Sequence, residues 1–197
     1  MKRSNRITYG IFKHVLGPLF KLYYHPKILG KEKIPKDGAL IFVGNHKHVM
    51  DQNAVIIVNK RPVRYMAKKE YFDGKFAWFF KAAGCISVNR SIRDEAAVED
   101  AIKELEEGGC VGLFPEGTRN KTDAFLLPFK FGAVSMAKKT KATLVPFGVS
   151  GDYKFRSKNL TYIFGDPIPY DDDLAKANEK IEKAIGDLMK QGEKLNK

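Results

Sequence analysis

Short apolar runs alternate with stretches of helical periodicity along most of this 197-residue chain. The runs Ala39–Val43, Cys110–Phe114 and Ala142–Val149 have the length and apolar content of buried strands. Further strands are expected at 63–67, 85–88 and 160–164, and helices at 52–58, 76–83, 94–107, 131–139 and after residue 171. Strands that alternate with helices in this way predict an α/β fold.

The length of the chain fits one domain with a short appendage and is sufficient to bury a core. We expect a basic, amphipathic helical segment over residues 1–30 and one folded domain over residues 31–197. An amphipathic helix is expected to close the domain, because one stripe of it carries Leu174, Ile181, Ile185 and Leu188.

The charge balance points to anionic partners. The chain has 35 Lys and Arg against 23 Asp and Glu, a net charge of +12, which attracts nucleic acid, an anionic bilayer or phosphorylated substrates. No helix-turn-helix, zinc-finger or aromatic RNA-binding motif is present, so nucleic acid is not the expected partner. Cys85 and Cys110 each lie in an apolar run without ligand spacing, which predicts neither a disulfide framework nor a zinc site and suits a reducing cytoplasm.

The N-terminal segment combines this positive charge with an apolar face. Residues 1–36 contain nine Lys or Arg and a single acidic residue, Glu32. Apolar residues recur there at near-helical spacing, at Ile7, Ile11, Phe12, Val15, Leu19, Phe20, Leu22 and Tyr23. Only Val15–Phe20 is uncharged between His14 and Lys21, far short of the roughly 20 apolar residues that a spanning helix needs.

The same segment is not expected to be a signal peptide, because Lys13 and His14 interrupt its apolar part. Pro18 predicts two short helices joined near Gly17 and Pro18. Two interpretations of the segment stay open. It is either an amphipathic anchor that lies in the lipid headgroup region or a helix that packs on the core.

A histidine and a carboxylate, His46 and Asp51, follow the first predicted strand and precede the next helix, where open α/β sheets place ligand crevices. Five residues apart on a regular helix they would point about 140° from one another, so they pair only if His46 lies in the turn. A carboxylate on one imidazole nitrogen leaves the other free to take a proton from a hydroxyl. His46 would then be a general base; the alternative is a helix-capping histidine beside an unrelated surface aspartate.

Two further segments follow predicted strands. In Phe114–Arg119, Gly117 permits a tight turn and Arg119 offers a planar fork that suits a phosphate. In Gly84–Arg90, Arg90 comes just past the end of a strand and can reach the same crevice, as can Lys68. The alternative for each segment is a surface loop with solvated basic side chains.

Taken together, these segments resemble the glycerolipid acyltransferases, specifically the 1-acyl-sn-glycerol-3-phosphate acyltransferase family. The family's Asn-His-x4-Asp motif is matched by Asn45, His46 and Asp51, and its Gly-x-Ile-x-Val-x-Arg strand by Gly84–Arg90. Its Phe-Pro-Glu-Gly-Thr-Arg motif is matched by Phe114–Arg119, and a weaker apolar-Pro-apolar motif by Val145–Phe147. The motifs stand in the family's order, and the resemblance covers about residues 30 to 170.

The resemblance implies a glycerolipid acyltransferase fold, with a mixed, largely parallel sheet flanked by helices. It also implies an enzyme that transfers an acyl group from acyl-CoA or acyl carrier protein to the sn-2 hydroxyl of lysophosphatidate, which gives phosphatidate. No metal, cofactor or covalent acyl-enzyme is required. The implied catalytic pair is His46 and Asp51, and the implied substrate-binding residues are Arg119, Glu116, Gly117 and Thr118, with Arg90 and Lys68 as further candidates.

The lipid acceptor implies an anionic membrane surface as a partner and a peripheral position on the cytoplasmic face of the cell membrane. An alternative acceptor is another lysolipid, such as lysophosphatidylcholine, a lyso-ornithine lipid or monolysocardiolipin. A nonenzymatic basic module that binds membrane or nucleic acid is a more distant alternative. The chain departs from the family at His48, where many members have a serine, but only His46 holds the motif position relative to Asp51.

Overall fold

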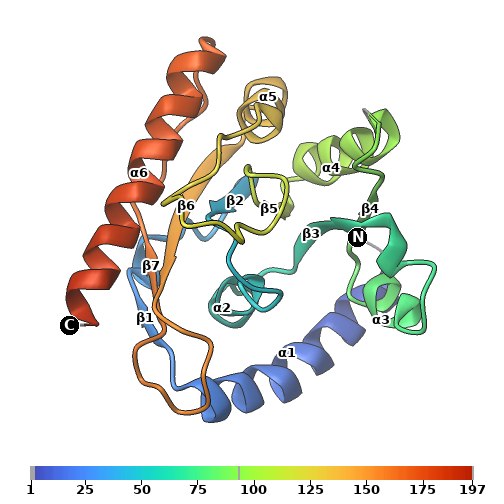
Figure 1. The fold of residues 1–197 in the computed structure, drawn as a ribbon. Helices are drawn as coiled ribbons and strands as arrows, with labels where there is room; N and C mark the ends of the chain where they lie inside the picture. Colours follow the sequence, from blue (N-terminus) through green and yellow to red (C-terminus); the bar gives the residue numbers. More distant parts are fainter. Residues whose placement is uncertain (1–2, 93, 197) are drawn as a thin grey trace.

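The computed structural model describes residues 3–92 and 94–196, without the side chains of residues 3–7 and 12. Its centre is a seven-stranded sheet with the strand order β1-β7-β6-β2-β5-β3-β4 (Figure 1). The strands are β1 (Lys27–Leu29), β2 (Leu40–Gly44), β3 (Val63–Lys68), β4 (Ile86–Val88), β5 (Cys110–Leu113), β6 (Thr143–Ser150) and β7 (Thr161–Phe164). The helices are α1 (Arg3–Tyr24), α2 (Gln52–Val58), α3 (Ala77–Ala82), α4 (Glu95–Glu106), α5 (Gly132–Thr140) and α6 (Leu174–Leu195).

All neighbouring strands are parallel except β6 and β7, which are antiparallel. The predicted mixed, largely parallel sheet is therefore confirmed. Parallel strands end at the same edge of a sheet, so the segments that follow β2, β3, β4, β5 and β6 all emerge on one side. That edge receives His46 and Asp51, Arg90 and the Phe114–Arg119 motif, whereas Val145–Phe147 lies within β6.

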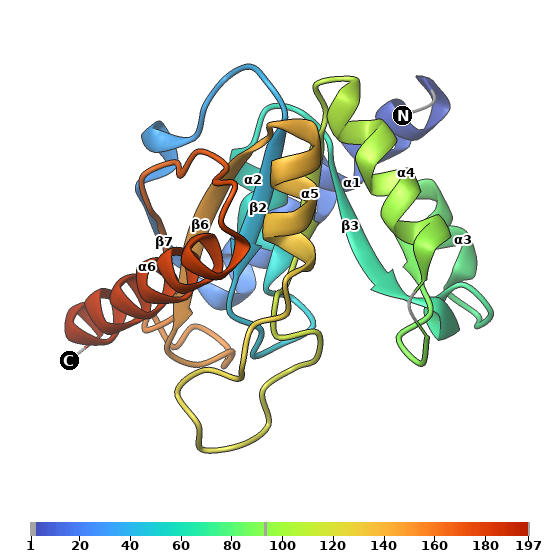
Figure 2. The ribbon, with the colours of Figure 1, turned by 90° about the horizontal axis from the view of Figure 1, so that it is seen from above.

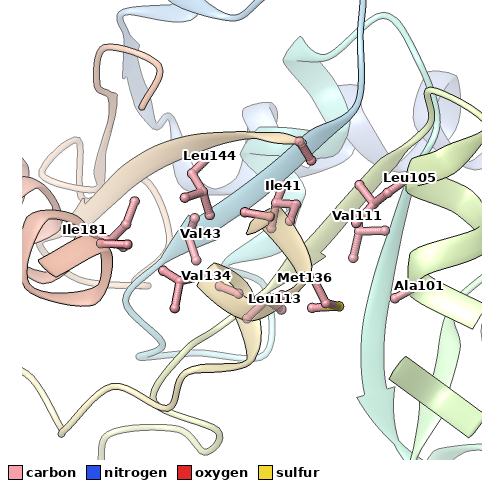
Figure 3. Packing of buried hydrophobic residues seen from close by; sticks show 14 of the residues in the cluster. Ile41, Val43, Ala101, Leu105, Val111, Leu113, Val134, Met136, Leu144 and Ile181 are labelled. Carbon is pink, nitrogen blue, oxygen red and sulfur yellow. The ribbon is translucent and has the colours of Figure 1, made fainter. Parts of the chain in front are cut away.

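Helices cover both faces of the sheet, and two apolar cores result. Along β2, Ile41 and Val43 point into one core while Leu40 and Phe42 point into the other, as the two-residue period of a strand requires. Figure 1 shows α4 and α5 above the sheet and α1 and α2 below it, and Figure 2 shows α5 and α6 in front of the strands. In the first core, side chains of the strands interlock with Ala101 and Leu105 of α4, Val134 and Met136 of α5 and Ile181 of α6 (Figure 3).

The predicted strands and helices end within one to three residues of the observed ones. Strand β1 was not expected, since Lys27–Leu29 carries little apolar pattern of its own. It forms because the edge of β7 supplies hydrogen-bonding partners, with Lys27 opposite Thr161 and Leu29 opposite Ile163.

The predicted break at Pro18 is wrong, because α1 runs unbroken from Arg3 to Tyr24 with Pro18 inside it. An internal proline costs a helix about 3 kcal/mol, so burial on both sides of the proline must hold the helix together. Tyr9 before it and Phe20 after it are buried. Gly17 lies directly against α2, where an added Cβ would stand 3.1 Å from the Ile57 side chain.

The outer face of α1 is apolar and exposed, at Ile11, Val15, Leu16, Leu19, Leu22 and Tyr23. One face of the helix thus packs on the core, as the second interpretation of the segment expected. The opposite, apolar face is exposed. Ile7 and Phe12, which the sequence placed in the apolar set, have side chains outside the described ones. In the described part of the chain no helix combines the length and apolar character that crossing a membrane requires.

Candidate active site

The turn between β2 and α2 is locked to the neighbouring strand. The Asn45 side chain donates to the backbone carbonyl of Val149 across 3.0 Å and accepts from its N–H across 2.7 Å. Gly44 allows the turn to approach β6, because an added Cβ would stand 2.4 Å from the Phe147 ring. These contacts fix the position of the backbone at His46, the next residue of the turn.

His46 and Asp51 form the pair that the sequence predicted. Nδ1 of His46 lies 2.8 Å from Oδ2 of Asp51, and the Asp51 side chain is fully buried. The same oxygen accepts the backbone N–H groups of Lys47 and His48 across 2.7 and 2.8 Å. Three donors compensate the buried charge, and His46 stands in the turn before the helix rather than capping it.

The contacts of the His46 ring fix its orientation as well as its tautomer. It stacks on Phe114, with the centroids 4.0 Å apart and the planes 6° from parallel. Because Nδ1 donates to a carboxylate, Nε2 carries the free lone pair. Within residues 3–92 and 94–196, the hydrogen bonds of the ring involve Nδ1 alone. The side chain is 11% exposed and lines a large groove, so Nε2 is available to a substrate hydroxyl.

The loop after β5 supports the histidine from the other side. Oε1 of Glu116 accepts the backbone N–H of His46 across 2.6 Å, and Oε2 accepts that of Leu127 across 3.0 Å. Glu116 is buried, and this burial raises the pKa of its carboxyl above the ordinary value. The Asn120 N–H donates to the His46 carbonyl across 2.7 Å. Glu116 is therefore directed at backbone groups and shapes the loop, while Gly117 turns the chain with a φ of +71°.

The predicted basic residues line the same groove, together with Gly117 and Thr118. Arg119 is half-buried beside the histidines. Lys68 ends β3 opposite Val88 of β4, so it lies next to the segment that carries Arg90. The Lys68 ammonium forms an ion pair of 2.7 Å with Glu70. This hydrogen bond, with the charge of Arg90 as a smaller cause, lowers the pKa of Glu70.

The groove has a volume of about 1610 Å³, larger than the roughly 300–1,000 Å³ of most small-molecule sites. Much of its lining is apolar and comes from α1, α2, α3 and β3, including Leu16, Phe20, Ile56, Ile57, Met66, Phe79 and Phe80. A site that combines a histidine base, cationic side chains and a long apolar wall suits a ligand with a polar head and a hydrocarbon chain.

Sequence reasoning missed Tyr153 and Tyr162. The Tyr153 hydroxyl donates to Oδ1 of Asp51 and lies 2.5 Å from the hydroxyl of Tyr162. Burial raises the pKa of both tyrosines well above the ordinary value, so both are protonated at neutral pH. Tyr153 follows the buried strand β6, and that position was the only sequence signal for it.

His48 carries the second imidazole near the site, and among the described residues no carboxylate is hydrogen-bonded to that ring. Its ring stacks on Tyr153 with a centroid distance of 4.2 Å, and its Nδ1 accepts the Met50 N–H across 3.4 Å. Partial burial lowers the pKa of His48. The geometry therefore distinguishes the two histidines, and His46 is the one with the orientation of a base.

Comparison with known proteins identifies relatives over most of the chain. The acyltransferase family model matches residues 25–150. The chain is 31% identical over 183 residues to the 1-acyl-sn-glycerol-3-phosphate acyltransferase of Bacillus subtilis, a match that covers 86% of this chain and 90% of that protein. It is 37% identical over 141 residues to the protein of the same name from Borreliella burgdorferi, which covers 70% of this chain and 56% of that relative.

The fold also has a solved counterpart. The crystal structure of the 1-acyl-sn-glycerophosphate (LPA) acyltransferase PlsC from Thermotoga maritima superposes with a TM-score of 0.77 at 22% identity, over 99% of this chain and 84% of that one. At that identity the likeness concerns the fold. The family match and the Bacillus relative show the family as well. The chain therefore belongs to the acyltransferase family and, within it, to the 1-acyl-sn-glycerol-3-phosphate acyltransferases that its motifs predicted.

Proposed function

We propose that the chain transfers an acyl group from acyl-CoA or acyl carrier protein to the free sn-2 hydroxyl of lysophosphatidate, which gives phosphatidate. The observation that carries this proposal is the His46–Asp51 pair, with Nδ1 and Oδ2 2.8 Å apart, on an apolar groove that Arg119 also lines. Relatives over most of the chain are 1-acyl-sn-glycerol-3-phosphate acyltransferases.

His46 acts as the general base. Its Nε2 takes the proton of the acceptor hydroxyl while the oxygen attacks the thioester carbonyl, and a new C–O bond forms. Asp51 stabilises the imidazolium that results. When the tetrahedral intermediate collapses, the C–S bond breaks and the leaving thiolate takes the proton back from Nε2. Atoms and charges balance without a covalent acyl-enzyme.

Both cysteines are unsuited to a covalent route. Burial raises the pKa of Cys85 to about 11 and also raises the pKa of Cys110. A thiol with such a pKa is protonated at neutral pH and is a poor nucleophile. This agrees with direct attack by the acceptor hydroxyl.

The acceptor phosphate is assigned to Arg119, with Gly117 and Thr118 beside it. A guanidinium presents two parallel donors to a phosphate, and Arg119 lines the groove with His46. Arg90 and Lys68 are further phosphate or donor contacts at the ends of β4 and β3. Lys68 must share its charge with Glu70, since the two are 2.7 Å apart. Glu116 contributes indirectly, through the loop that it holds.

The membrane surface is the proposed source of the acceptor. The exposed apolar face of α1 meets Phe155 of the loop between β6 and β7, whose ring centroid lies 5.0 Å from that of Tyr23. Phe76 and Trp78, at the start of α3, are further exposed aromatic side chains. Residues of α1 also line the groove, so a lysolipid can pass from the bilayer to His46 along the helix. Residues 1–30 would be the membrane-associating segment of an acyltransferase domain over 31–197, peripheral to the cytoplasmic face of the cell membrane.

The test is turnover by the purified full-length chain. Vesicles that contain lysophosphatidate are mixed with acyl-CoA or acyl carrier protein, free thiol is followed by absorbance, and phosphatidate by mass spectrometry. We expect turnover with at least one donor. Turnover with lysophosphatidylcholine or another lysolipid, and none with lysophosphatidate, would reassign the acceptor. No product from any donor and acceptor would contradict the proposal.

A further inference from the structure

We infer that Tyr153 is a positioning residue for the catalytic pair: its hydroxyl holds the second carboxylate oxygen of Asp51, so that the first faces the His46 imidazole. This inference rests on the proposed function, since it assigns a role to a residue of the same site. Tyr153 lies outside every motif that the sequence singled out.

The directions of the hydrogen bonds follow from the chemistry of a buried carboxylate. An ionised Asp51 only accepts, so the single proton of the Tyr153 hydroxyl goes to Oδ1. The Tyr162 hydroxyl lies 2.5 Å from that of Tyr153 and 3.5 Å from the Met50 carbonyl, and we assign its proton to the nearer oxygen, that of Tyr153. The result is a chain of donors from Tyr162 through Tyr153 that ends at Asp51, whose other oxygen accepts from Nδ1 of His46.

The chain of donors completes the coordination of Asp51. Oδ2 has three donors, from His46, Lys47 and His48, whereas Oδ1 has Tyr153. Without that hydroxyl, a buried carboxylate oxygen would lose a charge-assisted hydrogen bond. The carboxylate would then be free to rotate, and rotation disturbs the orientation of His46.

Tyr153 is itself held by its surroundings. Its ring stacks on His48 on one side and meets Tyr24 of α1 edge-on, with centroids 5.5 Å apart. The loop that carries it is tied down twice. The Lys47 ammonium donates to the Gly151 carbonyl across 3.0 Å, and the Arg156 N–H donates to the Tyr23 carbonyl across 2.8 Å. Figure 1 shows this loop, between β6 and β7, beside the end of α1.

The position of Asp51 therefore depends on three parts of the chain: its own turn, the loop after β6 and the end of α1. Among the described residues, the other titratable or charged groups near the pair are Lys47 and His48 of the turn, Glu116 and Arg119 of the loop after β5, Tyr65 of β3, and Tyr24 and Tyr162 beside Tyr153. All of them are retained in Tyr153→Phe, so a difference from the wild type reports the lost hydroxyl.

The variant Tyr153→Phe keeps the ring and removes only the donor. We expect kcat to fall about tenfold, as the loss of one hydrogen bond to a charged group would give, with KM for both substrates changed less than about twofold. Asp51, left with one donor fewer, should hold the imidazolium more strongly. The acidic limb of the plot of kcat/KM against pH should therefore move to higher pH, by about half a pH unit.

A second readout does not depend on turnover. In ¹⁵N-histidine spectra, with the His46 signals assigned through His46→Gln, the chemical shifts of the His46 ring nitrogens should change in Tyr153→Phe, because Nδ1 donates to the carboxylate that loses a partner. If the wild type has no turnover, the proposed function fails, and these spectra still test the role of Tyr153. Unchanged kcat, pH profile and His46 spectrum in a folded Tyr153→Phe would overturn the inference.

Two other tyrosines complete the experiment. Tyr162→Phe removes the donor to Tyr153 and leaves the bond to Asp51, so a smaller shift in the same direction is expected. If Tyr153→Phe does not fold, as judged by circular dichroism, Tyr162→Phe decides, and an unshifted pH profile there overturns the inference. Tyr170→Phe, an exposed position after β7, should match the wild type, and an equal effect there would also count against a specific role for Tyr153.

Discussion

The carboxylate of Glu116 accepts a hydrogen bond of 2.6 Å from the backbone N–H of His46, a residue that lies 70 positions earlier in the chain. The bond joins the turn after β2 to the loop after β5, two neighbouring strands that end at the same edge of the sheet. It places a residue of the Phe114–Arg119 motif against the backbone of the histidine.

Glu116→Ala should reduce both stability and turnover. The change removes the acceptor of two backbone N–H groups, those of His46 and Leu127, and should cost about 3 kcal/mol in the free energy of unfolding. Denaturant titration measures the loss, and kinetics should show a lower kcat. A variant with full stability and a raised KM for the acceptor would instead mean that Glu116 contacts substrate.

The stability of the wild type should depend on pH through the same carboxyl. Burial raises its pKa above the ordinary value of 4.5, so the native state binds this proton more tightly than the unfolded chain does. The resulting stabilisation is complete below pH 4.5 and is lost as the pH rises through the folded-state pKa. Relative to Glu116→Gln, which does not titrate, the wild type should lose free energy of unfolding across that range. Parallel curves for the two proteins would refute this.

His46→Gln should abolish turnover, because glutamine has no nitrogen that takes a proton at neutral pH. The expected fall in kcat is at least about a thousandfold, within the range for loss of a general base. His48→Gln is the matched control, since the His48 ring accepts the Met50 N–H and bonds no carboxylate of the described residues, and it should retain turnover within about tenfold. An inactive His48→Gln beside an active His46→Gln would mean that the wrong imidazole has been chosen.

Arg119→Lys tests the phosphate contact. Lysine keeps the charge and loses the planar fork, so KM for lysophosphatidate should rise about tenfold, with a smaller change in the KM of the acyl donor. Lys68→Ala should have a weaker effect, because Lys68 is already paired with Glu70 across 2.7 Å. A change confined to the KM of the donor would assign Arg119 to the donor instead.

The membrane role of α1 requires substitutions rather than a deletion. Removal of the helix would expose the core, since Tyr9 and Phe20 are buried. Val15→Asp with Leu22→Asp changes only outward positions, which are 53% and 66% exposed. Binding to anionic vesicles in a sedimentation assay should fall about tenfold or more. The melting temperature should stay close to that of the wild type, and unchanged vesicle binding would exclude this face as the anchor.

Much of the site could be predicted because its chemistry is local. The runs that became β2, β5 and β6 are apolar on both faces, which marks a central parallel strand in any window of the sequence. His46 and Asp51 are five residues apart, so the pair needs only a strand that turns into a helix. Arg119 and Arg90 follow strands, and the parallel order of the sheet then brings them to one groove.

Other features depend on partners that are distant in the sequence. Tyr153 meets Asp51 from 102 residues away, and no local pattern identifies a hydroxyl whose partner is a carboxylate in a distant turn. Pro18 predicts a break from local geometry alone, yet burial of α1 on both sides of it outweighs that preference. Strand β1 exists only because β7 offers an open edge.

The sequence by itself therefore determined the α/β class, the family and the candidate site residues, since periodicity, turn residues and motif spacing are all properties of short windows. The tertiary structure alone decided that α1 is continuous, that Glu116 faces the backbone of His46 and that Tyr153 holds Asp51. Those features are contacts between segments brought together by the sheet, and their energies arise only when strand ends far apart in the chain meet at one edge.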